Sequence, residues 1–133
     1  MSQTSADLVL AAVDAYNAGD FEAWEKCIAP DVQTFPASVF PEAGPLHGRD
    51  AYRAWTEEIG SAWISPRWEV TDVLAAGTDL VLCRGDWGGE GVASGIKTYA
   101  SITGVFTVRA DRVTRAEFYF DHAEALKAVG LEE

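Results

Sequence analysis

Apolar residues in the first 30 positions recur at the three- and four-residue spacings of helices. Val9, Val13 and Tyr16 share one face of a predicted first helix, which ends at the glycine of Asn17-Ala-Gly-Asp20. The same spacing continues over Phe21–Ile28, where Asp20 is the candidate N-cap and Pro30 ends the pattern. A second, short helix is therefore predicted to pack against the first.

The next stretch is interrupted by prolines. Residues 31–47 hold three prolines and a glycine, so after a brief strand at Val32–Phe35 we expect a mobile loop that crosses an opening. A third helix is predicted between Gly48 and Pro66. Its buried face is strongly aromatic and carries Tyr52, Trp55, Ile59 and Trp63.

The second half of the chain changes to the two-residue alternation of strands. The predicted strands are Trp68–Ala75, Leu80–Trp87, Thr98–Val108 and Val113–Phe120. Four sequential strands predict an antiparallel meander, in which we interpret the glycine-rich Trp87–Gly91 as a flexible hairpin tip. A short helix capped by Asp121 and ended by Gly130 closes the chain.

Helices followed by a run of strands predict one α+β domain over residues 1–133. We expect a strongly curved antiparallel sheet to wrap around the helices as a cone. The space between such layers commonly holds a small molecule, here an apolar one. The candidate substrate-binding residues that would line it are Tyr16, Trp55, Ile59, Trp63, Ile102, Phe118 and Phe120.

The charge balance excludes several kinds of partner. Ten basic and 21 acidic residues give a net charge of −11 and a pI near 4.4. This charge repels phosphate backbones and anionic lipids, so no nucleic-acid or membrane binding is expected. The first basic residue is Lys26, which is not the pattern of a secretory signal. We expect a cytoplasmic protein in which Cys27 and Cys83 are reduced thiols.

One pair of charged residues stands among apolar ones in the second predicted strand of the meander. Arg84 and Asp86 are two residues apart and share a sheet face with Leu80 and Leu82. If that face points inward, the pair is partly desolvated. We therefore assign Arg84 and Asp86 as candidate catalytic residues that stabilise charge on an oxygen or move a proton. The alternative is a structural ion pair at the rim of the cone.

The opposite face of this sheet also contains apolar residues. Its predicted members are Val81, Cys83, Trp87, Tyr99, Thr103 and Val105. An apolar outer sheet face predicts a homodimer that pairs through it.

Motifs for metals and cofactors are absent from the sequence. His47 and His122 have no metal-ligand spacing, and no phosphate-binding or dinucleotide fingerprint occurs. We expect neither a metal nor a cofactor.

The order of elements, together with three short motifs, resembles the nuclear transport factor 2-like superfamily. The motifs are Asn17-Ala-Gly-Asp20, His47-Gly-Arg-Asp-Ala51 and Phe118-Tyr-Phe-Asp-His122. Within the superfamily the chain is similar to SnoaL-like polyketide cyclases and ketosteroid isomerases, and over its last half to limonene-1,2-epoxide hydrolases. The resemblance implies a cystatin-like or SnoaL-like α+β barrel.

The resemblance does not carry a complete catalytic site. The oxyanion-hole tyrosine, general base and protonated aspartate of ketosteroid isomerase fall on Ala12, on Pro36 and near Gly104. The arginine and aspartate of the epoxide hydrolases match Arg84 and Asp86. The other positions of that site are occupied by residues that cannot do the same chemistry, namely Phe118, Thr34 and Pro36.

Two functional hypotheses follow. The first is a small-molecule-binding SnoaL-like domain with cofactor-independent isomerase, cyclase or hydrolase activity on an apolar substrate. The alternative is a non-catalytic ligand-binding or dimerisation module.

Overall fold

The computed structural model describes residues 4–36, 40 and 44–130. In this part the elements follow one another as α1 (Ser5–Ala18), α2 (Phe21–Cys27), β1 (Ile28–Phe35), β2 (Leu46–His47), α3 (Arg49–Gly60), β3 (Trp63–Ala76), β4 (Leu80–Gly91), β5 (Lys97–Arg109), β6 (Arg112–Tyr119) and α4 (His122–Ala128). The predicted α+β class is confirmed. The expected mobile loop falls partly on 37–39 and 41–43, which lie outside the described residues.

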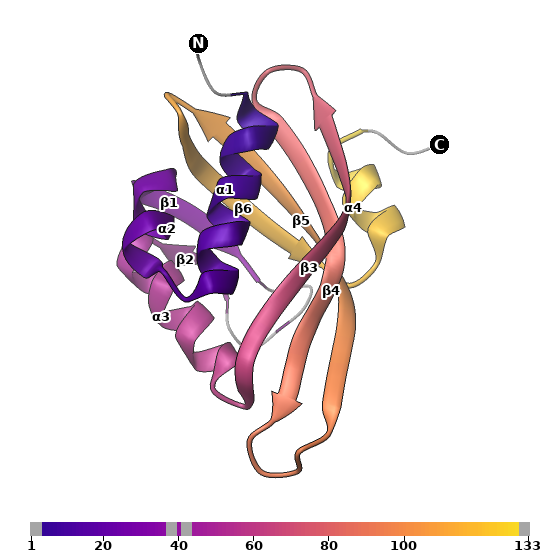
Figure 1. The fold of residues 1–133 in the computed structure, drawn as a ribbon. Helices are drawn as coiled ribbons and strands as arrows, with labels where there is room; N and C mark the ends of the chain where they lie inside the picture. The colour runs from indigo at the N-terminus through magenta and orange to yellow at the C-terminus, as the bar shows by residue number, and fades with distance from the viewer. Residues whose placement is uncertain (1–3, 37–39, 41–43, 131–133) are drawn as a thin grey trace.

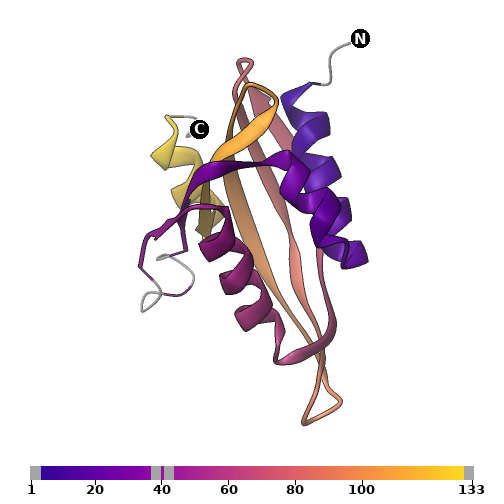
Figure 2. The same cartoon turned by 90° about the vertical axis from the view of Figure 1, so that its left-hand side faces the viewer.

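The strands form one six-stranded sheet in the order β2-β1-β6-β5-β4-β3 (Figure 1). β3 to β6 make the predicted antiparallel meander, whereas β1 pairs with β6 in parallel, so the sheet is mixed. Helices α1 and α3 lie on one side of the sheet and α4 lies on the other (Figures 1 and 2). The main core is therefore enclosed between α1, α3 and the inner sheet face.

Two predicted helix ends are wrong, and both errors come from proline. α2 stops at Cys27, and Ile28 already begins β1, which continues through Pro30. α3 stops at Gly60, and Trp63 begins β3, which contains Pro66. Pro66 is tolerated because β3 is the last strand of the sheet, where one edge has no strand to accept a backbone hydrogen bond.

The glycine-rich stretch after Trp87 is part of a strand rather than a hairpin tip. Gly88 and Gly89 lie inside β4 and pair with Tyr99 and Thr98 of β5. The turn of this hairpin comes later, over residues 92–96. The hairpin consequently extends well beyond the helices, at the bottom of Figure 1.

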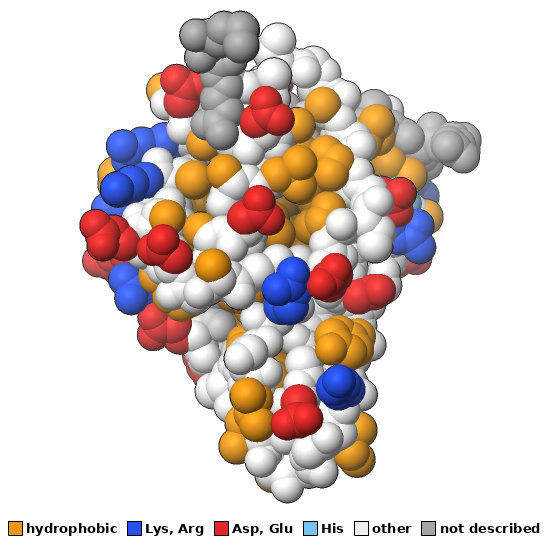
Figure 3. All heavy atoms as spheres, in the orientation of Figure 1, with side chains coloured by type: hydrophobic (Ala, Val, Ile, Leu, Met, Phe, Trp, Pro, Cys, Tyr) orange, Lys and Arg blue, Asp and Glu red, His pale blue; other side chains and the backbone are white. Residues whose placement is uncertain are grey.

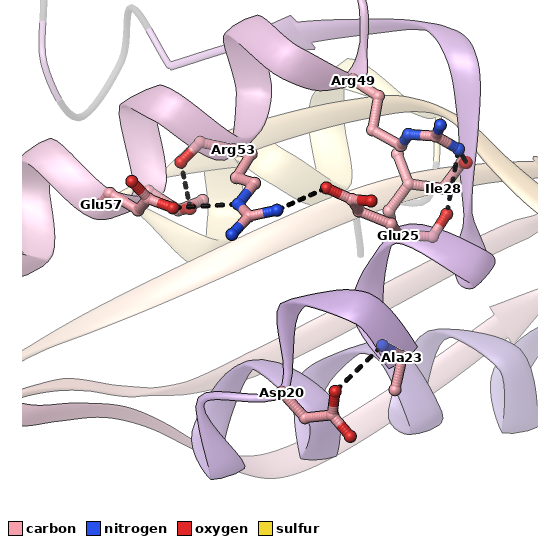
Figure 4. A network of polar contacts seen from close by, with 8 residues as sticks. Asp20, Ala23, Glu25, Ile28, Arg49, Arg53 and Glu57 are labelled. Atoms are coloured by element: carbon pink, nitrogen blue, oxygen red, sulfur yellow. Dashed lines mark hydrogen bonds and ion pairs between the residues drawn. The ribbon is translucent and has the colours of Figure 1, made fainter.

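Polar contacts join the start of α3 to α2 (Figure 4). Arg53 Nη1 lies 2.7 Å from Glu25 Oε1, and Arg53 Nε lies 2.9 Å from Glu57 Oε1. Arg49 Nη1 donates to the main-chain oxygens of Glu25 (3.2 Å) and Ile28 (3.3 Å). These carbonyls lie at the end of α2, where intrahelical donors run out. Arg49 therefore fixes the position of α3 over the sheet.

The asparagine of the first motif joins α1 to β3. Asn17 Nδ2 donates to the carbonyl oxygen of Trp68 (3.0 Å), and the Trp68 amide donates to Asn17 Oδ1 (2.8 Å). The side chain thus satisfies both main-chain groups of one residue on the last strand. This contact holds the end of α1 beside Trp68.

Asn17→Ala is expected to lower the free energy of unfolding by about 1–3 kcal/mol, because it removes two hydrogen bonds and leaves a partly buried N–H and C=O unpaired. Urea denaturation measures the change. Asp14→Ala, at an exposed position of the same helix, is the matched control and should change stability by less than about 0.5 kcal/mol. Equal midpoints for the two variants would contradict this role of Asn17.

The surface carries charges of both signs with apolar side chains between them (Figure 3). Hydrophobic side chains gather in the upper half of the face seen there. The exposed large apolar residues of β3 are Ile64, Val73 and Leu74. No helix in the described ranges is long and apolar enough to cross a membrane.

Candidate functional site

A cavity of about 70 Å³ lies between the helices and the inner face of the sheet. Its walls come from α1, α2 and α3 on one side and from β1 and β3 to β6 on the other. The described residues that line it are Val9, Ala12, Val13, Tyr16, Trp24, Ile28, Phe40, Tyr52, Trp55, Thr56, Ile59, Trp68, Trp87, Ile102, Phe106, Val113 and Phe118.

Aromatic rings form much of the wall and fix one another's orientation. Phe118 lies at the centre, with ring centroids of Trp55 at 5.5 Å, Phe106 at 5.9 Å and Trp68 at 6.3 Å. Trp68 and Phe106 approach Phe118 with steeply inclined rings, an arrangement that aromatic quadrupoles favour. The wall is therefore packed and apolar, and its shape depends on a few large side chains.

One hydrogen bond joins the helix layer to the sheet inside this wall. The indole N–H of Trp87 donates to the hydroxyl oxygen of Tyr16 over 3.0 Å. Burial raises the pKa of Tyr16, and the bond from Trp87 lowers it by a smaller amount. The Tyr16 proton has no acceptor within the described part of the chain, so this hydroxyl keeps a free donor.

Two further indole groups of the wall have no partner. Trp55 Nε1 and Trp68 Nε1 are buried and make no hydrogen bond within the described ranges. Tyr52 is fully buried, which raises the pKa of its hydroxyl above the ordinary value. The site is consequently rich in neutral hydrogen-bond donors.

Charged groups are missing from the described lining. No Asp, Glu, His, Lys or Arg of residues 4–36, 40 and 44–130 borders the cavity. The same residues contain no group of three His, Cys, Asp or Glu that could hold a metal ion. The cavity as described offers no counter-charge for an ionic ligand and no general base stronger than tyrosine.

A second, more open groove adjoins the cavity. It has a volume of about 310 Å³ and lies between the ends of α1 and α3 and the start of β3. Tyr16 and Thr56 border both spaces. Tyr16 therefore stands in the wall that separates the cavity from the groove.

The two faces of β4 are the reverse of those predicted. Val81, Cys83 and Trp87 belong to the inner core, whereas Leu82 packs on the outside against Ala125 of α4. Burial of this inner side raises the pKa of the Cys83 thiol to about 12.

The prediction that Arg84 and Asp86 face the cavity is therefore wrong. They share the side of Leu82, both are exposed, and the described structure contains no ion pair between them. Their placement gives no support to a catalytic role in the cavity.

The prediction of which residues form the outer face of β4 and β5 is wrong in part. Val81, Cys83 and Trp87 do not belong to it. Tyr99 and Val105 do, since Val105 packs under α4 and Tyr99 is 52% exposed. Thr103 lies on this side too, and its hydroxyl is 2.9 Å from His122 Nδ1 of α4.

Five of the seven predicted pocket residues line the cavity, namely Tyr16, Trp55, Ile59, Ile102 and Phe118. The other two do not. Trp63 packs behind the wall against Trp87, with ring centroids 4.6 Å apart. Phe120 follows the end of β6 and is 51% exposed.

Several lining residues were missed by the sequence interpretation. The largest are Trp24, Phe40, Tyr52, Trp68, Trp87 and Phe106. One signal was available: Val81, Cys83 and Trp87 alternate along β4 without a charged residue, which is the pattern of a buried face. Trp68 pairs directly with Trp87 across the two strands and therefore joins the same face.

Known structures share this fold. A protein of Catenulispora acidiphila with a ketosteroid isomerase-like fold, in complex with trimethylamine, is 18% identical with a TM-score of 0.73; the match covers 97% of this chain and 95% of that one. TerC co-crystallised with polyporic acid is 17% identical with a TM-score of 0.73, over 92% and 95%. A proposed polyketide cyclase of Sinorhizobium meliloti is 25% identical with a TM-score of 0.68, over 84% and 93%.

The fold is thus that of the nuclear transport factor 2-like, ketosteroid isomerase-like class. The model of the SnoaL-like domain family matches residues 9–116, and the chain belongs to this family. No protein among the curated sequences compared matches the chain.

Proposed function

We propose that the protein binds one small, neutral, largely apolar molecule in the cavity between α1, α3 and the sheet. One observation carries the proposal: the described lining is almost entirely aromatic and aliphatic and contains no charged side chain. Each Å² of apolar ligand surface removed from water contributes about 25 cal/mol. A charged ligand would lose its hydration without gaining a counter-charge.

The cavity volume limits the size of the ligand. About 70 Å³ is roughly half of the 150 Å³ of an engineered apolar cavity that takes up benzene. A two-ring ligand therefore has to displace rings of the wall. Phe40 packs against Trp55 and Trp87 with centroids 5.8 and 6.2 Å away, and we expect its ring to turn aside.

Related structures support a small molecule as the partner. TerC was crystallised with polyporic acid and the C. acidiphila protein with trimethylamine. The cytoplasmic location stays a prediction from the sequence.

The binding experiment compares neutral and charged ring compounds. Tetralin should quench tryptophan fluorescence saturably with one site, because four tryptophans border the cavity. The matched anion 1-naphthoate and the cation benzylammonium should bind at least tenfold more weakly. Equal or tighter binding of either ion would contradict a neutral site.

Cofactor-independent isomerisation or cyclisation is the second candidate function, favoured by the state of Tyr16. The bond from Trp87 polarises the hydroxyl and strengthens it as a donor, while its own proton is free. Such a donor can stabilise negative charge that develops on a ligand oxygen.

Tyr16→Phe is the test of this second function. On an identified substrate the variant should lower kcat by about 10²-fold or more while KM changes by less than threefold, since only the donor to the developing charge is lost. Thermal unfolding of the variant checks that the fold is retained. An unchanged kcat would exclude Tyr16 as the electrophile and leave binding as the function.

We also propose a homodimer that pairs through the outer sheet face, now supported by exposed charged residues on that face instead of apolar ones. Arg84 and Asp86 are exposed there, and neither belongs to an ion pair in the described structure. Across a twofold axis, Arg84 of one copy can pair with Asp86 of the other.

Charge reversal tests this arrangement. Sedimentation equilibrium should give twice the chain mass of 14.4 kDa for the unaltered protein. Arg84→Glu should shift it toward the monomer, and Arg84→Glu combined with Asp86→Lys should restore the dimer. A monomer before any substitution would reject the proposal.

A further inference from the structure

Two of the tryptophans in the cavity wall carry an unsatisfied polar group. Trp55 and Trp68 are only 8% and 7% exposed, and neither indole N–H has a hydrogen-bond partner in the described structure. Trp87, by contrast, donates to Tyr16. Native proteins leave few buried polar groups unpaired, so each such group calls for a physical explanation.

No acceptor of the described wall is bonded to these two donors. The Tyr16 oxygen receives the N–H of Trp87, and the Thr56 hydroxyl donates to the main-chain oxygen of Arg53, so neither hydroxyl is bonded to Trp55 or Trp68. Trp55 and Trp68 approach the same ring, since both pack on Phe118. The cavity wall thus holds two unpaired neutral donors on residues that pack against one aromatic side chain.

We propose that Trp55 and Trp68 are ligand-binding residues whose indole N–H groups donate to acceptor oxygens of the ligand. The inference rests on the proposed function and specifies its ligand class: a neutral ring compound that carries carbonyl or ether oxygens and no strong donor of its own. A carbonyl oxygen has two lone pairs and brings no extra proton into the cavity. An alcohol or amine would add another donor to a site that already has unpaired donors.

A pair of probes with one skeleton tests the assignment. Tetralin and 1-tetralone differ by a single carbonyl oxygen, and chroman-4-one adds a ring ether oxygen. Calorimetric titration of the unaltered protein should show 1-tetralone binding at least tenfold tighter than tetralin. Chroman-4-one should bind at least as tightly as 1-tetralone.

Variants show which residues cause the preference for 1-tetralone over tetralin. Trp55→Phe and Trp68→Phe keep an aromatic ring without the N–H; each should reduce the ketone preference, and the double variant should reduce it further, to what the Tyr16 hydroxyl alone can supply. Trp63→Phe is the matched control, because Trp63 does not border the cavity, and it should keep the preference. Circular dichroism checks that each variant folds.

A measurement on the unaltered protein tests the roles of Trp55 and Trp68 even if the variants do not fold. The five tryptophans give five indole N–H signals in nitrogen–proton NMR spectra. At saturation, 1-tetralone and tetralin should give different shifts at the signals of Trp55 and Trp68 and similar shifts elsewhere.

Different outcomes test the hydrogen bonds from Trp55 and Trp68 and the binding of an apolar ligand. Equal affinity for tetralin and 1-tetralone, or a preference that is undiminished in the double variant, overturns the role of Trp55 and Trp68 and leaves the apolar binding function intact. Binding of neither probe overturns the proposed function and this inference with it.

Discussion

Gly88→Ala is expected to lower the free energy of unfolding by more than about 4 kcal/mol, or to prevent folding. A Cβ atom at this position would lie 1.9 Å from the main-chain oxygen of Thr98 and 3.0 Å from the Cα of Tyr99. These are backbone atoms of the paired strand and cannot turn aside. The substitution would therefore separate β4 from β5 beside Trp87, whose indole holds Tyr16.

The matched control is Gly95→Ala on the same hairpin. Gly95 has a φ of +70° but no heavy atom within 4 Å of an added Cβ. Its substitution should cost only the conformational strain of about 1–2 kcal/mol. Chemical denaturation of both variants gives the comparison. Similar losses at the two positions would show that the close approach of β4 and β5 at Gly88 is not what requires glycine.

The second large effect is expected from filling the cavity. Ala12 is buried on α1 and borders the cavity, so Ala12→Leu places a branched side chain where the ligand would lie. The affinity for tetralin should fall at least tenfold, which corresponds to about 1.4 kcal/mol. Overpacking elsewhere in a core costs about 1–3 kcal/mol, but here the added atoms enter free space and the loss of stability should be smaller.

Ala11→Leu separates occupation of the cavity from a general effect on the helix. Ala11 is the neighbouring position on α1, is half-buried and does not border the cavity. The affinity of the Ala11→Leu variant for tetralin should equal that of the unaltered protein. Unchanged affinity in Ala12→Leu would place the binding site somewhere other than this cavity.

The element order could be predicted because each element carries its own local signal. The caps at Asp20 and Asp121 accept main-chain hydrogen bonds at the starts of α2 and α4. The errors occur where tertiary structure decides. Trp63 continues the helical spacing of α3, yet it starts β3, since sheet pairing with Gly91 outweighs a local pattern.

The orientation of β4 could not be predicted because apolar residues occur on both of its faces. Leu82 is apolar because α4 covers the outside of the sheet, whereas Cys83 and Trp87 are apolar because they face the core. The sequence alone does not show that the last helix crosses to the outer face. Because the wrong face of β4 was predicted to point inward, Arg84 and Asp86 were expected in the cavity, whereas both are exposed to solvent.

The candidate site was predictable where helices supply it. Tyr16, Trp55 and Ile59 follow from the periodicity of α1 and α3. The strand residues required the correct face, so Trp68 and Trp87 were missed. Phe120 has the same parity as Phe118, but β6 ends at Tyr119, and the alternation of sides no longer applies after that residue.

The most direct test of a neutral apolar binding cavity is an NMR titration of the indole signals with tetralin, for the unaltered protein and for Ala12→Leu. We expect saturable shifts of the signals of the four tryptophans that border the cavity, with a midpoint at an at least tenfold higher tetralin concentration in Ala12→Leu. The absence of saturable shifts in the unaltered protein, or the same midpoint in Ala12→Leu, would contradict a binding site in this cavity.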